Sequence, residues 1–332
     1  MSPRGMSRRQ ALKRAGLGLA GVAAASQLAG AADRHGTSDP HTVMTGGMPP
    51  VERSGIDPTR FLTHFDYGQV DRMANGRTVR EYSVSVVDRE IEVMPGVVYP
   101  AWTLNGQVPG PTLRCTEGDL LRVRFANASQ HPHTLHFHGF HPANMDGVFE
   151  VVEPGDTFLY EFDARPFGLH LYHCHVMPLK KHIAKGLYGA FIIDPPRPRR
   201  PANEMVMVMN GFDTNFDGEN EIYAVNTVPF AYQINPIPLV RGQLNRIYLV
   251  NILEFDLVNS IHVHANFFHV FRTGTSLVPG EFTDTITMGQ GERHILEFTY
   301  DRVGKFMFHA HQSEFAELGW MGLFDVREQG VV

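Results

Sequence analysis

The chain has 332 residues, of which 43% are hydrophobic and 19% charged, a composition typical of soluble globular proteins. Its length suits two domains of ordinary size, and its formal net charge of −6 argues against a nucleic-acid partner. The 18 histidines are an excess that needs an explanation, because histidine is the commonest metal-ligating side chain.

The amino terminus has the pattern of an export signal. The paired arginines Arg8 and Arg9 precede a weakly apolar run rich in alanine and glycine, and small residues follow at 29–32. This order predicts a signal peptide over residues 1–31, and the arginine pair resembles a twin-arginine signal. The apolar run is too short for a membrane span. Removing this segment, which has five basic and no acidic residues, would change the net charge from −6 to −11. We therefore expect an acidic protein exported to the periplasm or beyond the cell.

The next segment, residues 32–75, is predicted to be flexible. Its first part, residues 32–60, is rich in Gly, Pro, Ser and His and shows no hydrophobic periodicity.

Strand-like runs alternate with turn residues from about Thr78 onward. Examples are REYSVSVVDREIEV and LLRVRFANAS in the first half, and RIYLVNIL and GKFMFHAH in the second. The stretch PPRPRRPA at residues 195–202 interrupts the pattern and indicates a linker. Many short strands without a long amphipathic helix predict an all-β protein with a sandwich or barrel in each half. We place the first domain at residues 76–196, the linker at 197–203 and the second domain at 204–332.

One stretch partly matches a calcium-binding loop. DTNFDGENE begins at Asp213 with suitable residue types, but Ala224 stands at the twelfth position, where the loop needs glutamate. The stretch also lies among strands rather than between helices. We therefore predict a polar hairpin turn.

Histidine pairs of the form His-x-His occur four times, twice in each half. In a strand, residues i and i+2 point to the same face, so each pair presents two imidazoles side by side. One such pair is often a surface feature, but four in a repeated layout indicate metal binding by two similar domains. The pairs are His136 and His138, His173 and His175, His262 and His264, and His309 and His311.

Cys174 lies between the histidines of one pair and, by the same parity, faces away from them. His133 also has the opposite parity to its neighbouring pair, and His182 is the next histidine after His175. A His133, Cys174 and His182 set matches the trigonal His₂Cys arrangement of a blue copper site. His131 competes with His133 for this role.

The second half lacks the residues for such a site. Ala310 stands where the cysteine would be, and Asn259 stands three residues before His262, where a histidine would be. Cys115, the other cysteine, is predicted to be a lone core residue rather than a disulfide partner, because a metal-bound Cys174 thiolate would not be available for a bridge.

The motifs LHFHG, YHCH, IHVHAN and FHAH, together with NGQVPGPTLRCTEGD at residues 105–119, resemble the two-domain, laccase-like multicopper oxidases over roughly residues 76–330. This resemblance implies two cupredoxin-like Greek-key β-barrel domains, about four copper ions per chain and reduction of dioxygen to water. It implies a homotrimer with trinuclear sites between subunits, and a blue copper in domain 1 only, the layout called type C. Carried over to this chain, His136 and His262 would hold the type 2 copper. The type 3 pair would be held by His138, His173, His175, His264, His309 and His311.

Two features depart from the family pattern. His182 follows Cys174 by eight residues rather than five, so the loop VMPLKK is longer and closer to that of copper nitrite reductases. In the family, the axial neighbour of the blue copper lies five residues beyond the second histidine, which is Leu187 here. Because leucine cannot ligate a metal, we predict a trigonal copper. Met177, in the longer loop, is the alternative axial ligand.

Reduction of dioxygen also needs protons, and acids near the ligands are candidates to deliver them. Asp146, Glu314 and Glu317 lie close in sequence to the histidine pairs, and His141 and His269 are candidate supporting residues. The expected function is laccase-like oxidation of phenols or other small reductants. The alternatives are a copper nitrite reductase and a cuprous or ferrous ion oxidase, and a copper carrier would not need the eight paired histidines.

Overall fold

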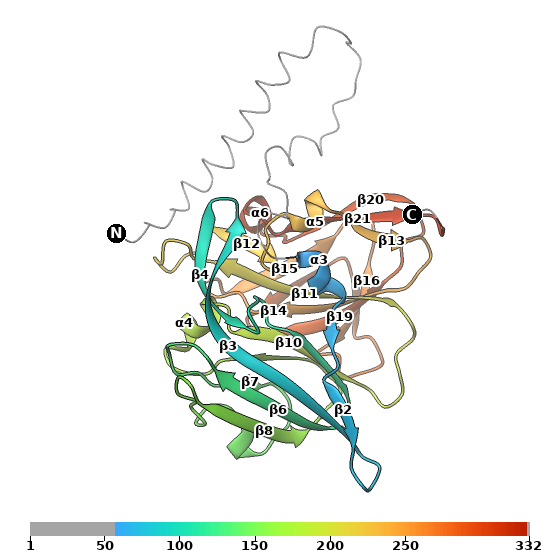
Figure 1. Cartoon of the computed structure of the whole chain (residues 1–332). Helices are drawn as coiled ribbons and strands as arrows, with labels where there is room; N and C mark the ends of the chain where they lie inside the picture. The colour runs from blue at the N-terminus through green and yellow to red at the C-terminus, as the bar shows by residue number, and fades with distance from the viewer. Residues whose placement is uncertain (1–56, 331–332) are drawn as a thin grey trace, which may run out of the picture.

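The computed structural model describes residues 57–330, so the predicted signal segment lies outside the described residues. The described chain forms two β-rich halves, coloured blue to green and yellow to red in Figure 1. No helix in this part of the chain is long and apolar enough to cross a membrane.

The first half contains two five-stranded sheets. One has the order β1-β5-β10-β9-β7, and the other has the order β2-β3-β6-β8 with β4 also paired to β3. The elements are α3 (Pro58–Thr63), β1 (Phe65–Asp66), β2 (Gln69–Arg72), β3 (Thr78–Met94), β4 (Val97–Leu104), β5 (Thr112–Thr116), β6 (Leu120–Asn127), β7 (His136–Phe137), the 3₁₀ turn η2 (Ala143–Met145), β8 (Thr157–Asp163), β9 (Gly168–His173), α4 (Leu179–Ala184) and β10 (Tyr188–Asp194).

The second half contains a six-stranded sheet, β12-β11-β14-β19-β16-β17, and a five-stranded sheet, β13-β21-β20-β15-β18. The elements are β11 (Asn203–Phe212), β12 (Ile222–Val225), α5 (Ala231–Ile234), β13 (Ile237–Val240), β14 (Asn245–Asn251), β15 (Val258–Val263), β16 (Phe268–Arg272), β17 (Glu281–Thr283), β18 (Thr285–Gly289), β19 (Arg293–Phe298), β20 (Gly304–His309), α6 (Ser313–Glu317) and β21 (Met321–Arg327).

The two halves repeat the same strand pairing. In the first, β10 runs parallel to β5 and antiparallel to β9, and in the second, β21 has the same relation to β13 and β20. The β3, β6 and β8 set likewise corresponds to β11, β14 and β19. The all-β prediction with two cupredoxin-like units is therefore confirmed, and the histidine repeat reflects a repeat of the fold.

The amino-terminal part differs from the expectation of a flexible segment over residues 32–75. Its described portion forms α3, β1 and β2. The Asp57 carboxylate caps α3 by accepting from the backbone N–H groups of Thr59 and Arg60. Leu62 is buried in the core of the second half, and the Tyr232 hydroxyl donates to the Pro58 carbonyl at 2.8 Å. This prediction was wrong for residues 57–72 because packing against distant strands orders a segment that has no periodicity of its own.

The two halves share a buried interface. A hydrophobic cluster combines residues of the first half, such as Tyr99 and Ile192, with residues of the second, such as Phe212 and Tyr248. Beside it, Glu204 accepts from Arg114 at 2.7 Å and from Arg246 at 2.8 Å. The proline-rich residues 195–202 run past these charges between β10 and β11.

Candidate metal centre

The histidine pairs lie where paired strands end. β7 pairs with β9 so that His136 stands opposite His173, and β15 pairs with β20 so that His262 stands opposite His309. Because the second histidine of each pair lies two residues further along, each half gathers four imidazoles. We call His136, His138, His173 and His175 the first-half cluster, and His262, His264, His309 and His311 the second-half cluster.

The two clusters have nearly the same geometry. Within the first, the Nε2 atoms of His138 and His173 lie 3.3 Å apart, and within the second, those of His264 and His309 lie 3.0 Å apart. His136 and His262 each lie beside such a pair, with ring centroids at 4.9–5.5 Å from their neighbours. Among residues 57–330, no set of converging ligand atoms combines histidines from both clusters.

Hydrogen bonds fix the tautomer of one histidine in each close pair. His173 Nδ1–H donates to the Cys174 carbonyl at 2.9 Å, and His309 Nδ1–H donates to the Ala310 carbonyl at 2.6 Å. A carbonyl can only accept, so the Nε2 atom of each ring carries a lone pair directed at another imidazole. This is the form in which histidine binds a metal, and the clusters therefore fit metal ions.

Hydrogen bonds at Nδ1 also fix the tautomers of His136 and His262. His136 Nδ1–H donates to the Asp146 carbonyl at 2.7 Å, and His262 Nδ1–H contacts the Asp284 carbonyl at 3.1 Å and the Thr285 hydroxyl at 2.8 Å. Each half thus places an aspartate loop behind its histidine and leaves the Nε2 atom free to ligate.

Cys174 forms a separate site with His133 and His182 on the other face of the strand. Its Sγ atom lies 3.2 Å from His182 Nδ1 and 3.7 Å from His133 Nδ1, and the two nitrogens lie 3.2 Å apart. A point in the plane of these atoms lies about 2 Å from all three, close to a metal–nitrogen bond length. All three side chains are buried. The set therefore fits a single metal ion in trigonal coordination.

Burial sets the protonation of these groups. Desolvation lowers the pKa of His133 to about 3 and the pKa values of His173 and His182 to about 4. The imidazoles are thus neutral at neutral pH, as ligands must be. Desolvation also raises the pKa of the Cys174 thiol, and a bound metal cation would favour its thiolate.

The geometry separates the alternative ligands. His131 is exposed, and its ring packs on Trp102 with centroids 4.8 Å apart. The Met177 side chain is 77% exposed, which argues against an axial role. Leu187 is fully buried, and its carbonyl accepts from the Cys174 N–H at 3.1 Å. His133 and Leu187 are therefore the choices that the structure favours.

The candidate acids are placed differently. An Asp146 carboxylate oxygen lies 3.3 Å from His136 Nδ1 and 3.6 Å from His141 Nε2. Glu314 and Glu317 are exposed on α6, and no set of converging ligand atoms among the described residues includes either. Asp284, which the sequence reasoning missed, lies 4.0 Å from His262. No sequence pattern pointed to Asp284, because it follows β17 and lies far along the chain from every histidine pair.

Two other sequence predictions concern residues outside these sites. Cys115 is a buried free thiol, and its burial raises its pKa. Residues 213–221 join the antiparallel strands β11 and β12, in agreement with the hairpin prediction. The Asp213 carboxylate there accepts from the N–H groups of Asp217 and Gly218 at 3.1 and 2.8 Å.

The second half has a metal-free counterpart of the Cys174 site. The Ala310 N–H donates to the Trp320 carbonyl as Cys174 donates to Leu187, and the Trp320 N–H donates to Phe315 as Leu187 donates to His182. Asn259 completes the set by accepting from the Trp320 indole N–H at 3.0 Å. Trp320 thus stands at the position of Leu187 and Phe315 at that of His182, and the sequence revealed Ala310 and Asn259 but not Phe315 and Trp320.

Two cupredoxin-like domains with a buried His₂Cys site and two half-clusters of imidazoles define a two-domain cupredoxin metalloprotein. Profiles described as multicopper oxidase match residues 86–198 and 198–330. The crystal structure of a multicopper oxidase superposes with a TM-score of 0.83 at 53% identity, covering 84% of this chain and 100% of that chain. The chain therefore belongs to the multicopper oxidase family, whose cofactor is copper.

Nitrite reductases are also similar. The copper nitrite reductase of Nitrosomonas europaea superposes with a TM-score of 0.69 at 25% identity, covering 76% of this chain and 95% of that chain. The copper-containing nitrite reductase of Neisseria meningitidis is 30% identical over 249 residues, which cover 69% of this chain and 64% of that protein. The chain thus spans just under two thirds of the length of this curated relative.

Proposed function

We propose that this protein is a laccase-like multicopper oxidase that couples one-electron oxidation of phenolic or other small reductants to reduction of dioxygen to water. The observation that carries the proposal is the presence of all eight paired imidazoles in two matched clusters in addition to the His₂Cys site. A nitrite reductase or an electron carrier needs the Cys174 site but not both clusters.

The resemblance to the family supplies the assignment of roles, and the grouping of the side chains supports it. Copper bound by these residues would supply one-electron redox chemistry and a place for dioxygen. His133, Cys174 and His182 would hold the blue copper, with Leu187 as a non-ligating axial neighbour. His136 and His262 would hold the type 2 copper, and the type 3 pair would be held by His138, His173, His175, His264, His309 and His311. About four copper ions per chain would then be bound.

The chain itself provides the route between the two kinds of site. Cys174 is covalently flanked by His173 and His175, and the His173 Nδ1–H bond to the Cys174 carbonyl adds a second, shorter connection. Asp146 would hold or deliver protons beside His136, and Asp284 would do so beside His262. Glu314 and Glu317 remain sequence-based candidates for proton delivery.

The arrangement also supports a homotrimer with active clusters between subunits. The two clusters of one chain do not converge, and a cluster of eight imidazoles would form where the first half of one copy meets the second half of another. Large exposed apolar residues lie near both clusters in sequence, with Phe140 62% and Phe267 47% exposed. We further propose export by the twin-arginine route through residues 1–31.

A copper nitrite reductase is the second candidate. The eight-residue spacing between Cys174 and His182 and the similarity to the Neisseria nitrite reductase favour it. A cuprous or ferrous ion oxidase would share all of the ligands, and a copper resistance protein A from Escherichia coli is 36% identical over 146 residues, 42% of this chain and 22% of that protein.

Copper counting together with oxygen uptake separates these functions. We expect about four copper ions per chain and oxygen uptake with a phenolic donor. About two copper ions with nitrite turnover and no oxygen uptake would establish the nitrite reductase instead. A ratio of oxygen uptake on cuprous ion to uptake on phenol far above one would favour the metal-ion oxidase.

A further inference from the structure

The loop that makes this chain depart from its family has a definite shape. Residues between Cys174 and His182 include the start of α4 (Leu179–Ala184), which directs the His182 ring into the buried site. Lys180 and Lys181 on the same helix are exposed, and Lys185 follows at its end. The longer loop therefore adds cations beside the Cys174 site as well as a ligand.

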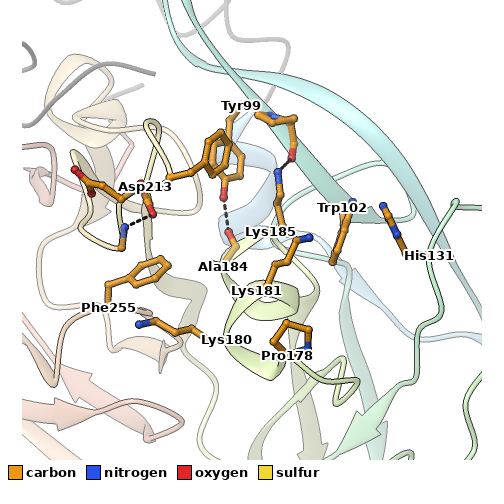
Figure 2. A pocket seen from close by; sticks show the side chains of 14 residues that line it. Tyr99, Trp102, His131, Pro178, Lys180, Lys181, Ala184, Lys185, Asp213 and Phe255 are labelled. Atoms are coloured by element: carbon orange, nitrogen blue, oxygen red, sulfur yellow. Dashed lines mark hydrogen bonds between the residues drawn. The ribbon is translucent and has the colours of Figure 1, made fainter. Parts of the chain in front are cut away.

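These cations line a pocket of about 790 Å³ between the two halves. Its aromatic walls include Tyr99 and Trp102 from the first half and Phe216 and Phe255 from the second. Figure 2 shows Lys180, Lys181 and Lys185 in the middle of the view, with Asp213 and Phe255 on one side and Trp102 and His131 on the other. The volume is ample for a single substituted aromatic ring.

Most lysines of the chain lie at this one pocket. The whole chain has five lysines against 24 arginines, and three of the five line this pocket. The ammonium group of each of the three lies over an aromatic ring. The distance from Nζ to the ring centroid is 4.4 Å for Lys180 over Phe255, 5.3 Å for Lys181 over Trp102 and 4.7 Å for Lys185 over Phe216. In a protein of net negative charge, such a patch concentrates anions.

Neighbouring acids attract these lysines without removing their availability: Glu254 interacts electrostatically with Lys180, and Asp88 and Asp213 interact electrostatically with Lys185. Asp213 is buried, and both of its oxygens accept backbone N–H groups of its own loop. Asp217 lines the pocket and accepts from the Glu219 N–H at 3.0 Å. Among the described residues, Lys180 and Lys181 have no ion pair with a carboxylate within 4.0 Å. Both ammonium groups are therefore available to a ligand.

Trp102 connects this pocket to the Cys174 site. Its ring centroid lies 5.2 Å from that of His133 and 4.8 Å from that of His182. A donor in contact with the outer face of the indole would be separated from the metal-binding imidazoles by one aromatic ring.

We propose that this pocket binds anionic aromatic reductants, such as carboxylated phenols, with the carboxylate on Lys180 and Lys181 and the ring against the aromatic walls. The proposal rests on the oxidase function proposed above and names its substrate class. In each one-electron oxidation, the phenol O–H bond breaks and the proton goes to solvent. The electron passes by way of Trp102 toward the Cys174 site. Four donors supply four electrons, and with four protons one dioxygen gives two waters.

The test measures binding to the copper-loaded protein of probes that have no phenolic hydroxyl, so it does not depend on the oxidase reaction. Calorimetry would compare three probes: 4-methoxybenzoate, which has ring and charge but no oxidisable hydroxyl; 4-methoxybenzyl alcohol, which has the ring alone; and acetate, which has the charge alone. We expect 4-methoxybenzoate to bind at least about tenfold more tightly than the other two. The double variant Lys180→Gln/Lys181→Gln should weaken it about tenfold, whereas Lys305→Gln, an exposed lysine of the second half, should not.

Equal affinity for the benzoate and the alcohol, or no effect of the double variant, would overturn the proposal. Equal affinity for acetate would reduce the pocket to a simple anion site and also overturn it. If the benzoate binds as expected but the copper-loaded protein takes up no oxygen with any phenol, the oxidase function fails while the binding site stands.

Discussion

Four side chains distinguish the Cys174 site of the first half from its counterpart in the second half. His133, Cys174, His182 and Leu187 of the first half are replaced by Asn259, Ala310, Phe315 and Trp320 of the second, with the same pattern of backbone hydrogen bonds. The backbone arrangement therefore persists without the ligand side chains, and Asn259 satisfies the indole N–H of the buried Trp320. Electrons enter the proposed enzyme on one side only.

Cys174 is the first residue whose replacement tests this scheme. In Cys174→Ser the soft thiolate is lost, so we expect the intense visible absorption to disappear and oxygen uptake to fall at least about 100-fold. Copper bound by the two histidine clusters should remain. Cys115→Ala is the matched control, because Cys115 is equally buried but has no ligand near it; this variant should keep its colour. Retained colour in Cys174→Ser would refute the assignment.

The buried histidines predict a pH dependence of the metal-free protein. His133, His173 and His182 have folded-state pKa values of about 3 to 4, well below their ordinary value. Between pH 7 and 5 the unfolded chain therefore binds protons that the folded chain does not, and stability falls by about 1 to 2 kcal/mol for each histidine. Urea unfolding at the two pH values measures this loss.

A variant shows whether these groups cause the slope. His182→Asn should make the loss between pH 7 and 5 smaller than in the parent protein, because it removes one of these buried imidazoles. An unchanged loss in this variant would mean that other groups dominate the titration.

Short elements mark the limit of prediction from the sequence. The long strands, such as β3 and β11, carry enough alternating or continuous apolar residues to be recognised. The His-x-His parity predicted neighbouring imidazoles, and the two rings of each pair do lie side by side. α3 and α4 have six residues each, too few for a helical period, so their existence depends on tertiary contacts. The pocket beside α4 could not be predicted from the sequence either, because its walls come from strands and loops of both halves that only the tertiary fold brings together.

The linker region supports a prediction at the scale of elements. Glu204 at the start of β11 accepts from Arg114, Arg246 and the Tyr248 hydroxyl at 2.7–2.8 Å. Glu204→Gln removes the negative charge between two buried guanidinium groups, so we expect unfolding to become easier by about 3 kcal/mol. Glu328→Gln in the exposed pair with Arg241 is the control and should cost less than about 1 kcal/mol. Equal effects in urea unfolding would show that the buried network does not hold the halves together.

At the scale of the whole molecule, the separation of the two histidine clusters makes one subunit incomplete for dioxygen chemistry. The buried core and the ion pairs between the halves fix their relative position within a chain, so the clusters of one copy are not free to swing together. In the proposed homotrimer, a second copy would complete each cluster, and a ring closed by identical head-to-tail contacts would account for all copies at once.

Complementation between inactive variants tests this directly. His136→Ala/His138→Ala destroys the first-half cluster, and His262→Ala/His264→Ala destroys the second-half cluster, so each variant alone should be inactive. When both are produced together, every mixed trimer has one junction at which an intact first half meets an intact second half. Random mixing should therefore restore about a quarter of the parent oxygen uptake per chain. If the clusters were completed within one chain, no mixture could recover activity. Mixed trimers that form, as shown by differently tagged copies purifying together, yet take up no oxygen would contradict the shared site.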